Sequence, residues 1–368
     1  MAKPKFFKSK SGNIPLPVFF PDATRAVLKT LDSIDIEQTK TKGILVNTYH
    51  LYKDLGKSVI KEHGGIRNFM NFKGGVISDS GGFQVMSLAK TLGGKITDNG
   101  VTFKPQGEPK ITLTPEDSIE FQSALNTDMV VVLDDFTPPN ATELEAKETV
   151  ERTLLWAKRC RAKFDELTKG KKEKPYLLGV AQGGKYQDLR AYCTKELVKI
   201  GFDGIGYGGW PINEVNEFDY ESAKTIADNT PEDYFLYGLG IGKPHEIVKL
   251  AGGGYNIFDC VLPTRDARHK RLYVYNADNI SSINVNLPDF YSYFVPDKQK
   301  YYHDTRPVST ACDCLLCKNY SRAYLAHLFR NKEMTAGRLA TIHNLRFYSI
   351  LMDKLTKIYN ELWIHNSL

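Results

Sequence analysis

Eight short apolar runs recur along the first 260 residues, and segments long enough for a helix separate most of them. Several end in a polar or glycine-rich turn such as Pro21-Asp22 or Gly208-Gly209. Short apolar strands that alternate with helices are typical of a parallel sheet, and eight such units favour a closed (β/α)8 TIM barrel over the alternative, an open doubly wound sheet. The runs are 17–20, 43–46, 75–77, 129–133, 176–180, 204–207, 234–237 and 256–258.

The segments between these runs carry helix start signals. Thr114 precedes Pro115 and two acidic residues, which is the pattern of an N-cap followed by proline in the first turn. Asn140 followed by Glu143 resembles a capping box. We therefore expect helices to begin directly after Thr114 and Asn140.

Two segments interrupt the alternation. Residues 90–115 contain Gly93-Gly94 and Asp98-Asn99-Gly100, which predicts an inserted hairpin or two. The C-terminal part contains a cysteine cluster and two expected helices, 319–329 and 334–357. We therefore predict a catalytic barrel over residues 1–295 and a zinc-binding C-terminal subdomain over residues 296–368 that packs on the barrel.

The composition is that of an ordinary globular protein, with 42% hydrophobic and 25% charged residues in 368. A formal charge of +6 permits a nucleic-acid partner without requiring one. No apolar run reaches membrane-spanning length, and the N-terminus does not have the pattern of a signal peptide. Six cysteines do not suggest a disulfide framework here, so we expect a cytoplasmic protein.

Three cysteines lie within six residues, in the order C-x-C-x-x-C. Cys312, Cys314 and Cys317 with His343 would complete a tetrahedral zinc site without an open position, which is typical of structural zinc. His327 is the rival fourth ligand, and its apolar neighbours instead suggest a helix face packed on the barrel. Three thiols without a metal remain the alternative.

A carboxylate follows the last apolar run at Asp259, and Arg265 and Arg268 lie shortly after it. A nucleophilic Asp beside cationic side chains suits a substrate with an anionic backbone. Aspartate at the end of a strand is also common turn chemistry, so a purely structural role stays open. Asp79, Asp134, Gln182 and Gly209 likewise follow predicted strands, where the working residues of such barrels lie.

Taken together, the motifs resemble those of the tRNA-guanine transglycosylase family, in its bacterial and eukaryotic branch. The resemblance implies a zinc-containing barrel enzyme, usually a homodimer, that belongs to the pentosyltransferases. It would exchange guanine at wobble position 34 (G34) of GUN tRNA anticodons for a 7-deazaguanine, in queuosine biosynthesis. The matching stretches run in order from about residue 11 to 360: Asn47 to Leu51, Asp79 to Gln84, Gln182-Gly183-Gly184, Phe202-Asp203-Gly204, Phe258 to Arg265, the three cysteines with Asn319 to Leu325, and His343-Asn344-Leu345.

The resemblance also implies residue roles. Asp259 would form the covalent ribosyl intermediate, and Asp79 would be the general acid and base, supported by Ser80. Asp134 would accept from the base, Gln182 and the Gly209 backbone N–H would donate to it, and Phe83 and Tyr237 would stack on its two faces; Arg265 and Arg268 would hold the anticodon loop. The structural alternatives are an Asp134 ion pair, a Gln182 that braces its turn, and aromatic packing.

Several positions depart from the family pattern, among them Phe136, Trp210, Phe235 and Tyr237, which stands where Met is more usual. Phe136 and Trp210 are bulkier than usual, which favours a small 7-substituent and hence preQ1 over queuine. Phe235 stands where Tyr is usual, so a hydroxyl near the nucleophile should be missing. A queuine- or preQ0-using enzyme, a non-catalytic partner subunit and a DNA-modifying relative remain alternative functions.

Overall fold

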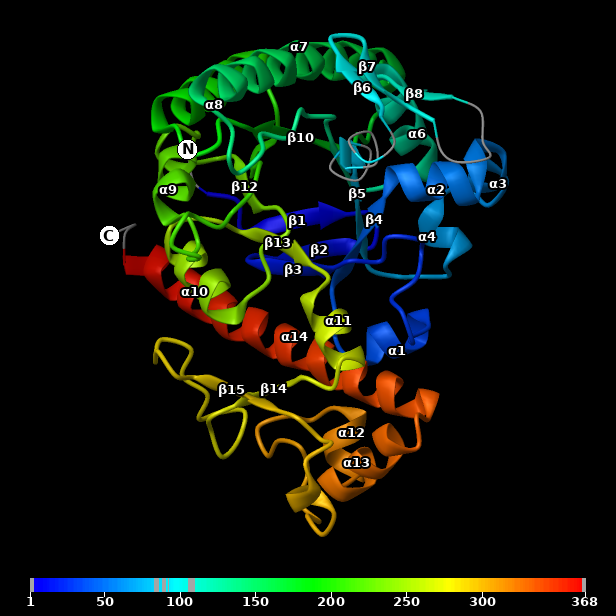
Figure 1. Ribbon diagram of the computed structural model, residues 1–368, viewed down its shortest axis with the longest axis vertical. Helices are drawn as coiled ribbons and strands as arrows, with labels where there is room; N and C mark the ends of the chain where they lie inside the picture. Colours follow the sequence, from blue (N-terminus) through cyan, green and yellow to red (C-terminus); the bar gives the residue numbers. More distant parts are fainter. Residues whose placement is uncertain (1–2, 83–85, 88–90, 92, 105–109, 366–368) are drawn as a thin grey trace.

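Eight parallel strands form the centre of the molecule (Figure 1). The computed structural model describes residues 3–82, 86–87, 91, 93–104 and 110–365, with side chains through residue 359. The sheet runs in the order β3-β13-β12-β11-β10-β9-β5-β4. Each predicted apolar run overlaps one strand, and several strands extend one or two residues past the run. The bounds are β3 Val18–Pro21, β4 Gly43–Asn47, β5 Gly75–Asp79, β9 Met129–Val131, β10 Tyr176–Ala181, β11 Gly204–Tyr207, β12 Phe235–Gly238 and β13 Ile257–Cys260.

The two end strands of this sheet meet. Asp22, directly after β3, forms a parallel bridge with Leu45 of β4. The backbone N–H of Ala23 donates to the carbonyl of Leu45 at 2.7 Å. These contacts close the sheet, which confirms the predicted barrel and excludes the open doubly wound alternative.

Aromatic side chains fill the N-terminal end of the barrel. An antiparallel hairpin, β1 Phe6–Ser9 and β2 Gly12–Pro15, brings Phe7 to 5.5 Å from Phe20 and 6.0 Å from Phe235, between ring centroids. Tyr176 lies 4.8 Å from Phe235. Phe235 therefore lies at the opposite end of its strand from the turn beside Asp259, and the expectation that it affects the nucleophile is wrong.

Helices surround the barrel. Thr114 caps α6 as predicted, with a reciprocal box to Asp117. The predicted Asn140–Glu143 box is wrong, because Thr142 and Glu145 form the box two residues later, after a turn at Pro138. The helices are α1 Ser33–Gln38, α2 Thr48–Asp54, α3 Gly56–Glu62, α4 Ile66–Phe69, α6 Pro115–Leu125, α7 Glu143–Thr168, α8 Gln187–Ile200, α9 Tyr220–Asp228, α10 Pro244–Gly252 and α11 Leu262–Arg268.

The insertion between β5 and α6 forms a small antiparallel sheet, in agreement with the predicted hairpins. Its strands are β6 Lys95–Thr97, β7 Gly100–Phe103 and β8 Ile111–Leu113. Phe103 of this sheet packs 5.6 Å from Tyr49, which lies in α2 near the C-terminal end of β4. The insertion thus covers one side of the barrel mouth.

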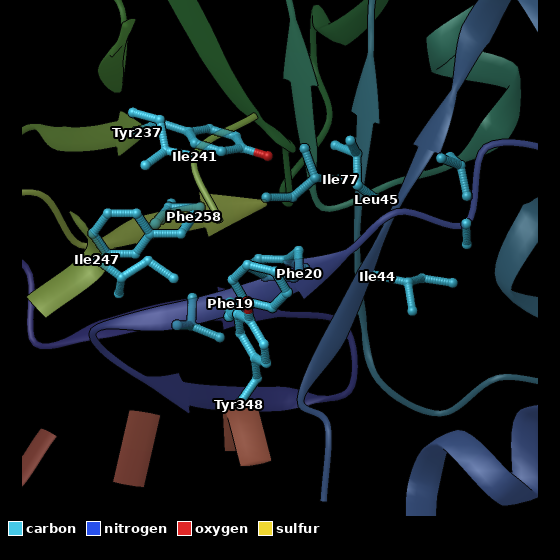
Figure 2. Close-up of a cluster of buried hydrophobic side chains, with 14 of the residues drawn as sticks. Phe19, Phe20, Ile44, Leu45, Ile77, Tyr237, Ile241, Ile247, Phe258 and Tyr348 are labelled. Carbon is cyan, nitrogen blue, oxygen red and sulfur yellow. The ribbon is translucent and has the colours of Figure 1, made fainter. Parts of the chain in front are cut away.

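The C-terminal segment lies beyond a long helix, α14 Met334–His365, which runs along the barrel (Figure 1). Tyr348 of α14 packs against Phe19 of β3 (Figure 2), with 4.6 Å between their ring centroids. The hairpin β14 Leu272–Tyr275 and β15 Tyr291–Phe294 lies on the far side of α14, with η1 Gln299–Tyr301, α12 Leu315–Asn319 and α13 Arg322–Arg330. The subdomain boundary at 295/296 stays a prediction. In the described part of the chain, no helix has both the length and the apolar character needed to cross a membrane.

Candidate active site

The C-terminal ends of β13, β5 and β9 bring three buried or half-buried acids to the barrel mouth. Asp259 of β13 is 6% exposed, and one of its carboxylate oxygens accepts from the Gly240 N–H at 2.9 Å. Burial is the main cause that raises its pKa from 3.8 to about 7, and the nearby Asp22 and Asp79 carboxylates add to the shift. Such an acid is ionised for only part of the time at neutral pH.

Asp79 is the last residue of β5, and hydrogen bonds from the end of β4 and from its own turn hold its carboxylate. Asn47 Nδ2 donates to Asp79 Oδ2 at 2.8 Å, and the N–H of Gly81 donates to the same oxygen at 3.3 Å. Burial raises the pKa of Asp79 to about 6 against these hydrogen bonds, with a further contribution from Asp22. A carboxyl group with a pKa near 6 can both give and take a proton at neutral pH.

Asp134 and Gln182 form one unit at the ends of β9 and β10. Gln182 is fully buried, donates from Nε2 to Asp134 Oδ2 at 2.6 Å, and accepts from the Thr137 N–H at 3.1 Å. Burial raises the pKa of Asp134 to about 7, and Asp79 also contributes. Asp134 accepts from Gln182, and its neighbour Asp135 forms the ion pair with Arg152.

The turn after β11 requires glycine at positions 208 and 209, because a side chain would have no space at the first and would leave a strained backbone at the second. A Cβ atom on Gly208 would lie 2.6 Å from Gln182 Nε2, and Gly209 has a φ of +84°. Arg190 of α8, which the sequence analysis did not single out, fixes this turn. It is fully buried and donates to the carbonyl groups of Gly208 at 2.8 Å and Ala181 at 3.1 Å. Gln182 and Gly209 thus have a shared support beneath them.

The residues predicted to support Asp79 or to stack on the base have different surroundings. Ser80 is buried and accepts from the Gly82 N–H at 3.2 Å. Phe83 lies outside the described residues. Tyr237 is completely buried in the barrel core (Figure 2), so its ring offers no exposed face, and its stacking on a base stays a prediction. Its hydroxyl lies near Asp259, an interaction that raises the Tyr237 pKa together with burial, the larger cause.

The two predicted tRNA-binding arginines lie on α11, the short helix that follows β13, the strand of Asp259. Arg265 is exposed, whereas Arg268 is half-buried and donates to the Thr264 carbonyl at 2.8 Å. Burial lowers the pKa of Arg268, and the nearby Arg265 adds to the effect. Two cations therefore lie side by side within nine residues of Asp259 in sequence.

The four predicted metal ligands form one cluster, with their ligand atoms all within 4.8 Å of one another. His343 Nδ1 lies 3.5 Å from Cys314 Sγ and 3.3 Å from Cys317 Sγ. His343 Nε2 lies 2.7 Å from the Tyr273 carbonyl, to which it can donate, and this leaves Nδ1 for a metal. Three thiols and one imidazole fit a closed zinc site.

His327 is not part of this cluster. It lies on an exposed face of α13 beside Asn331, so the expected packing of His327 on the barrel is wrong. Asn344, next to His343, is fully buried and connects the cluster to the barrel mouth. Its side chain donates to the Pro263 carbonyl at 3.0 Å and accepts from the Tyr273 N–H at 3.1 Å. The metal cluster therefore supports α11.

Comparison with known proteins agrees with this geometry. The family model for queuine tRNA-ribosyltransferase matches residues 5–359. The chain belongs to the queuine tRNA-ribosyltransferase family. It is thus an enzyme of the pentosyltransferase class.

Relatives in this family match nearly end to end. A queuine tRNA-ribosyltransferase of Vibrio atlanticus is 39% identical over 352 residues, which are 95% of this chain and 87% of the relative. The enzyme of the same name from Acinetobacter baumannii is 41% identical over 344 residues, 93% of this chain and 86% of the relative. A relative from a Shewanella species is 39% identical over 345 residues, 94% of this chain and 87% of the relative.

Proposed function

We propose that this queuine tRNA-ribosyltransferase family member exchanges guanine at the wobble position of a tRNA anticodon for a 7-deazaguanine. The observation that carries the proposal is the set of buried or half-buried acids at the barrel mouth, with which no Lys or Arg among the described residues forms an ion pair. Asp259, Asp79 and Asp134 all have raised pKa values, chiefly because they are buried. Perturbed carboxyl groups that gather in this way are typical of active sites, where they serve catalysis and not stability.

The reaction divides into two displacements at the ribose anomeric carbon. Asp259 attacks C1′, a bond forms between C1′ and the carboxylate oxygen, and the bond from C1′ to guanine N9 breaks. The departing guanine takes up a proton, for which Asp79 is the donor. The incoming base then gives a proton back to Asp79, attacks C1′ through its ring nitrogen, and releases Asp259.

Recognition of the base falls to the opposite side of the mouth. Asp134 would accept from the N1–H and amino group of a guanine-like base, while Gln182 and the Gly209 N–H would donate to its carbonyl oxygen. Gln182 already donates to Asp134 at 2.6 Å, so the two side chains are fixed relative to each other. Ser80 supports Asp79 through the adjacent turn, and Phe83 and Tyr237 are the candidates for contact with the ring faces.

Arg265 and Arg268 would bind the phosphates of the anticodon loop, which positions the substrate without reading its sequence. The Cys3His cluster would hold one structural zinc ion, whose role is to fix the segment that supports α11. Elemental analysis should find one zinc per chain, and Cys317→Ala should lose it. A chain that retains the metal in this variant would require another ligand.

Among the 7-deazaguanines we favour preQ1. Phe136 is half-buried, directly after the Asp134-Asp135 turn, and its bulk would restrict the pocket there. Trp210 supports this preference less than its size suggests. It is 48% exposed and lines a cavity of about 380 Å³ with Thr137 and Lys185, outside the predicted base contacts. Competition among preQ1, preQ0 and queuine for labelled guanine would test the order.

We also propose a cytoplasmic homodimer. Four exposed apolar side chains lie on α1, on residues 320–324 at the start of α13 and at the start of α14, and exposed apolar patches commonly mark interfaces. The Arg338–Asp35 ion pair joins α1 to α14, and Tyr320 stacks on Tyr324 with 5.2 Å between the ring centroids. Sedimentation should give a dimer that Ile34→Glu dissociates. The four side chains are Ile34, Tyr320, Tyr324 and Met334.

The experiment that tests the activity is the incorporation of radiolabelled guanine into unmodified tRNA with a GUN anticodon. Label in the tRNA, together with a denaturation-resistant protein–RNA adduct, is the expected outcome. Absence of label would favour a non-catalytic partner subunit. Label that enters a DNA oligonucleotide but not tRNA would favour a DNA-modifying relative.

A further inference from the structure

A fourth carboxylate, Asp22, lies at the barrel mouth and has no part in the chemistry described above. In the parallel pairing of β3 with β13, Phe20 lies opposite Asp259. Paired residues of a parallel sheet point to the same face, and so do residues two apart in one strand. Because Phe20 points into the barrel toward Phe7, Asp22 and Asp259 point into it as well.

The Asp22 carboxylate is only partly used by the protein. Thr24 Oγ1 donates to Asp22 Oδ1 at 2.6 Å, and the Thr24 backbone adds a second hydrogen bond. The residue is half-buried, and no Lys or Arg in the described ranges forms an ion pair with it. His50 lies nearby, but burial and Arg25 lower the pKa of its imidazole, so it is mostly neutral at pH 7. An ionised carboxylate has about four acceptor positions, so capacity remains for a ligand.

The order of strands shows which part of the substrate Asp22 faces. Asp134, Gln182 and Gly209 follow β9, β10 and β11, on one side of the barrel. From β13 in the other direction around the barrel, the next strands are β3 and β4. If Asp259 bonds to C1′ while the base lies toward β9 to β11, the rest of the sugar must lie toward β3 and β4.

The chemistry of the sugar narrows the contact further. An anionic acceptor repels phosphate and attracts a hydrogen-bond donor. In an internal nucleotide of RNA the 3′ and 5′ oxygens are esterified, so the 2′-hydroxyl is the one ribose donor, and its carbon is bonded to C1′. We propose that Asp22 accepts a hydrogen bond from the 2′-hydroxyl of the nucleotide whose base is exchanged, and so selects RNA over DNA.

This proposal rests on the proposed function, in which Asp259 attacks the same sugar. A hydrogen bond from the 2-hydroxyl of a sugar strengthens as the anomeric carbon becomes cationic, so the contact should contribute more to the transition state than to binding. Asp22 would thereby be a specificity-determining residue. The 2′-hydroxyl is the group by which proteins distinguish RNA from DNA at a given site.

The test compares two anticodon stem-loops that differ only at the wobble nucleotide, one with ribose and one with 2′-deoxyribose. For each protein, kcat/KM for exchange of labelled guanine is measured on both. The ratio of ribose to deoxyribose activity should fall by roughly 10- to 100-fold in Asp22→Ala, the worth of a hydrogen bond to a charged group. Asp22→Asn keeps an acceptor oxygen without the charge and should fall in between.

Asp54→Asn is the matched control, because Asp54 pairs with Arg25 near the same rim and its loss should leave the ratio unchanged. An unchanged ratio in both Asp22 variants overturns the proposal. If a variant is inactive on both stem-loops, the ratio of their equilibrium affinities is measured by fluorescence anisotropy; it should also fall, by a smaller factor than kcat/KM, and an unchanged affinity ratio overturns the proposal. If the wild-type protein labels neither stem-loop, the proposed function fails, and the affinity ratio still tests the contact of Asp22.

Discussion

Buried aspartates at the two ends of the barrel have opposite electrostatic surroundings. At the N-terminal end, Asp128 accepts from the backbone N–H groups of Lys10 and Val76, each at 2.8 Å, and forms an ion pair with Arg67. At the C-terminal end, Asp259 accepts from one backbone N–H, at Gly240, and faces the carboxylates of Asp22 and Asp79. Asp128 thus has a cationic partner and two backbone donors, whereas Asp259 has one backbone donor and lies near two other carboxylates.

We infer from this difference that Asp128 serves the stability of the barrel and that Asp259 serves its chemistry. A buried carboxylate with a cationic partner and several hydrogen-bond donors joins the elements that supply them; Asp128, directly before β9, binds Arg67 of α4 and the Val76 N–H of β5. A buried carboxylate without a cation costs free energy to ionise, and it gains reactivity from that cost. In barrels of this architecture the C-terminal end carries the active site and the N-terminal end carries stability, and the two aspartates follow that division.

The largest expected effect comes from Asp259→Asn. Loss of the proposed nucleophile should reduce guanine exchange by about 10⁴-fold or more, since comparable losses follow removal of nucleophiles elsewhere. The protein should be as stable as the wild type or slightly more stable, because a poorly compensated buried acid has been neutralised. Exchange kinetics and thermal unfolding measure the two effects, and tRNA affinity should persist. A labelled adduct in this variant would assign the nucleophile to another residue.

The reciprocal change is Asp128→Ala at the other end. Removal of one partner from a buried ion pair typically destabilises a protein by about 3–5 kcal/mol, because Arg67 would keep a buried, unpaired charge. Chemical denaturation measures the loss. The activity per folded molecule should stay within a few-fold of the wild type. A much larger loss of activity per folded molecule would show that the N-terminal end of the barrel also has a functional role.

The sequence alone gave a good account of the barrel and of the residues at its mouth. The apolar runs found all eight strands, because each run ends in a polar turn that stops the strand. Asp79, Asp134 and Asp259 could be placed at one end because the C-terminal ends of parallel strands lie together.

The inward or outward direction of a side chain could not be predicted in this way. Pro21-Asp22 resembled an ordinary turn, and only the pairing of Phe20 with Asp259 turns Asp22 into the barrel. Phe235 was misplaced for a different reason, since it lies on the inner face but at the N-terminal end of β12, two residues before Tyr237. Arg190 gave no signal in the sequence, because its burial depends on carbonyl groups at the ends of two neighbouring strands, those of Ala181 at the end of β10, Gly184 after it and Gly208 after β11.

The comparison also predicts a pH dependence. In the proposed mechanism Asp259 must be ionised to attack and Asp79 must be protonated to donate, so kcat/KM should pass through a maximum between about pH 6 and about pH 7, to which burial and the neighbouring carboxylates raise the two pKa values. In Asp22→Asn one of those neighbouring charges is absent for both groups, so the maximum should move to lower pH, by roughly half a unit to one unit. A profile that does not change in this variant would show that Asp22 is not charged near Asp259.

Stability should also change with pH. Between pH 3.8 and about 7, folded Asp259 keeps a proton that the unfolded chain has released. The unfolded state therefore binds fewer protons in this window, and the free energy of unfolding falls as pH rises, by at most about 1.4 kcal/mol per unit for one group. Asp259→Asn should reduce this slope, which denaturation at several pH values can measure.

The smallest expected effect concerns Tyr237, which lies beside Asp259 without an ion or a regular hydrogen bond. Among the described residues its buried hydroxyl has no hydrogen-bond partner of good geometry. A buried polar group without a partner costs about 1–3 kcal/mol in proteins, so Tyr237→Phe should leave stability unchanged or raise it by about 1 kcal/mol. Thermal unfolding and exchange kinetics would show this, with activity within about tenfold of the wild type. A clear loss of stability would mean that the Tyr237 hydroxyl donates a hydrogen bond to Asp259. Asp259 would then have a second donor, and its surroundings would differ less from those of Asp128.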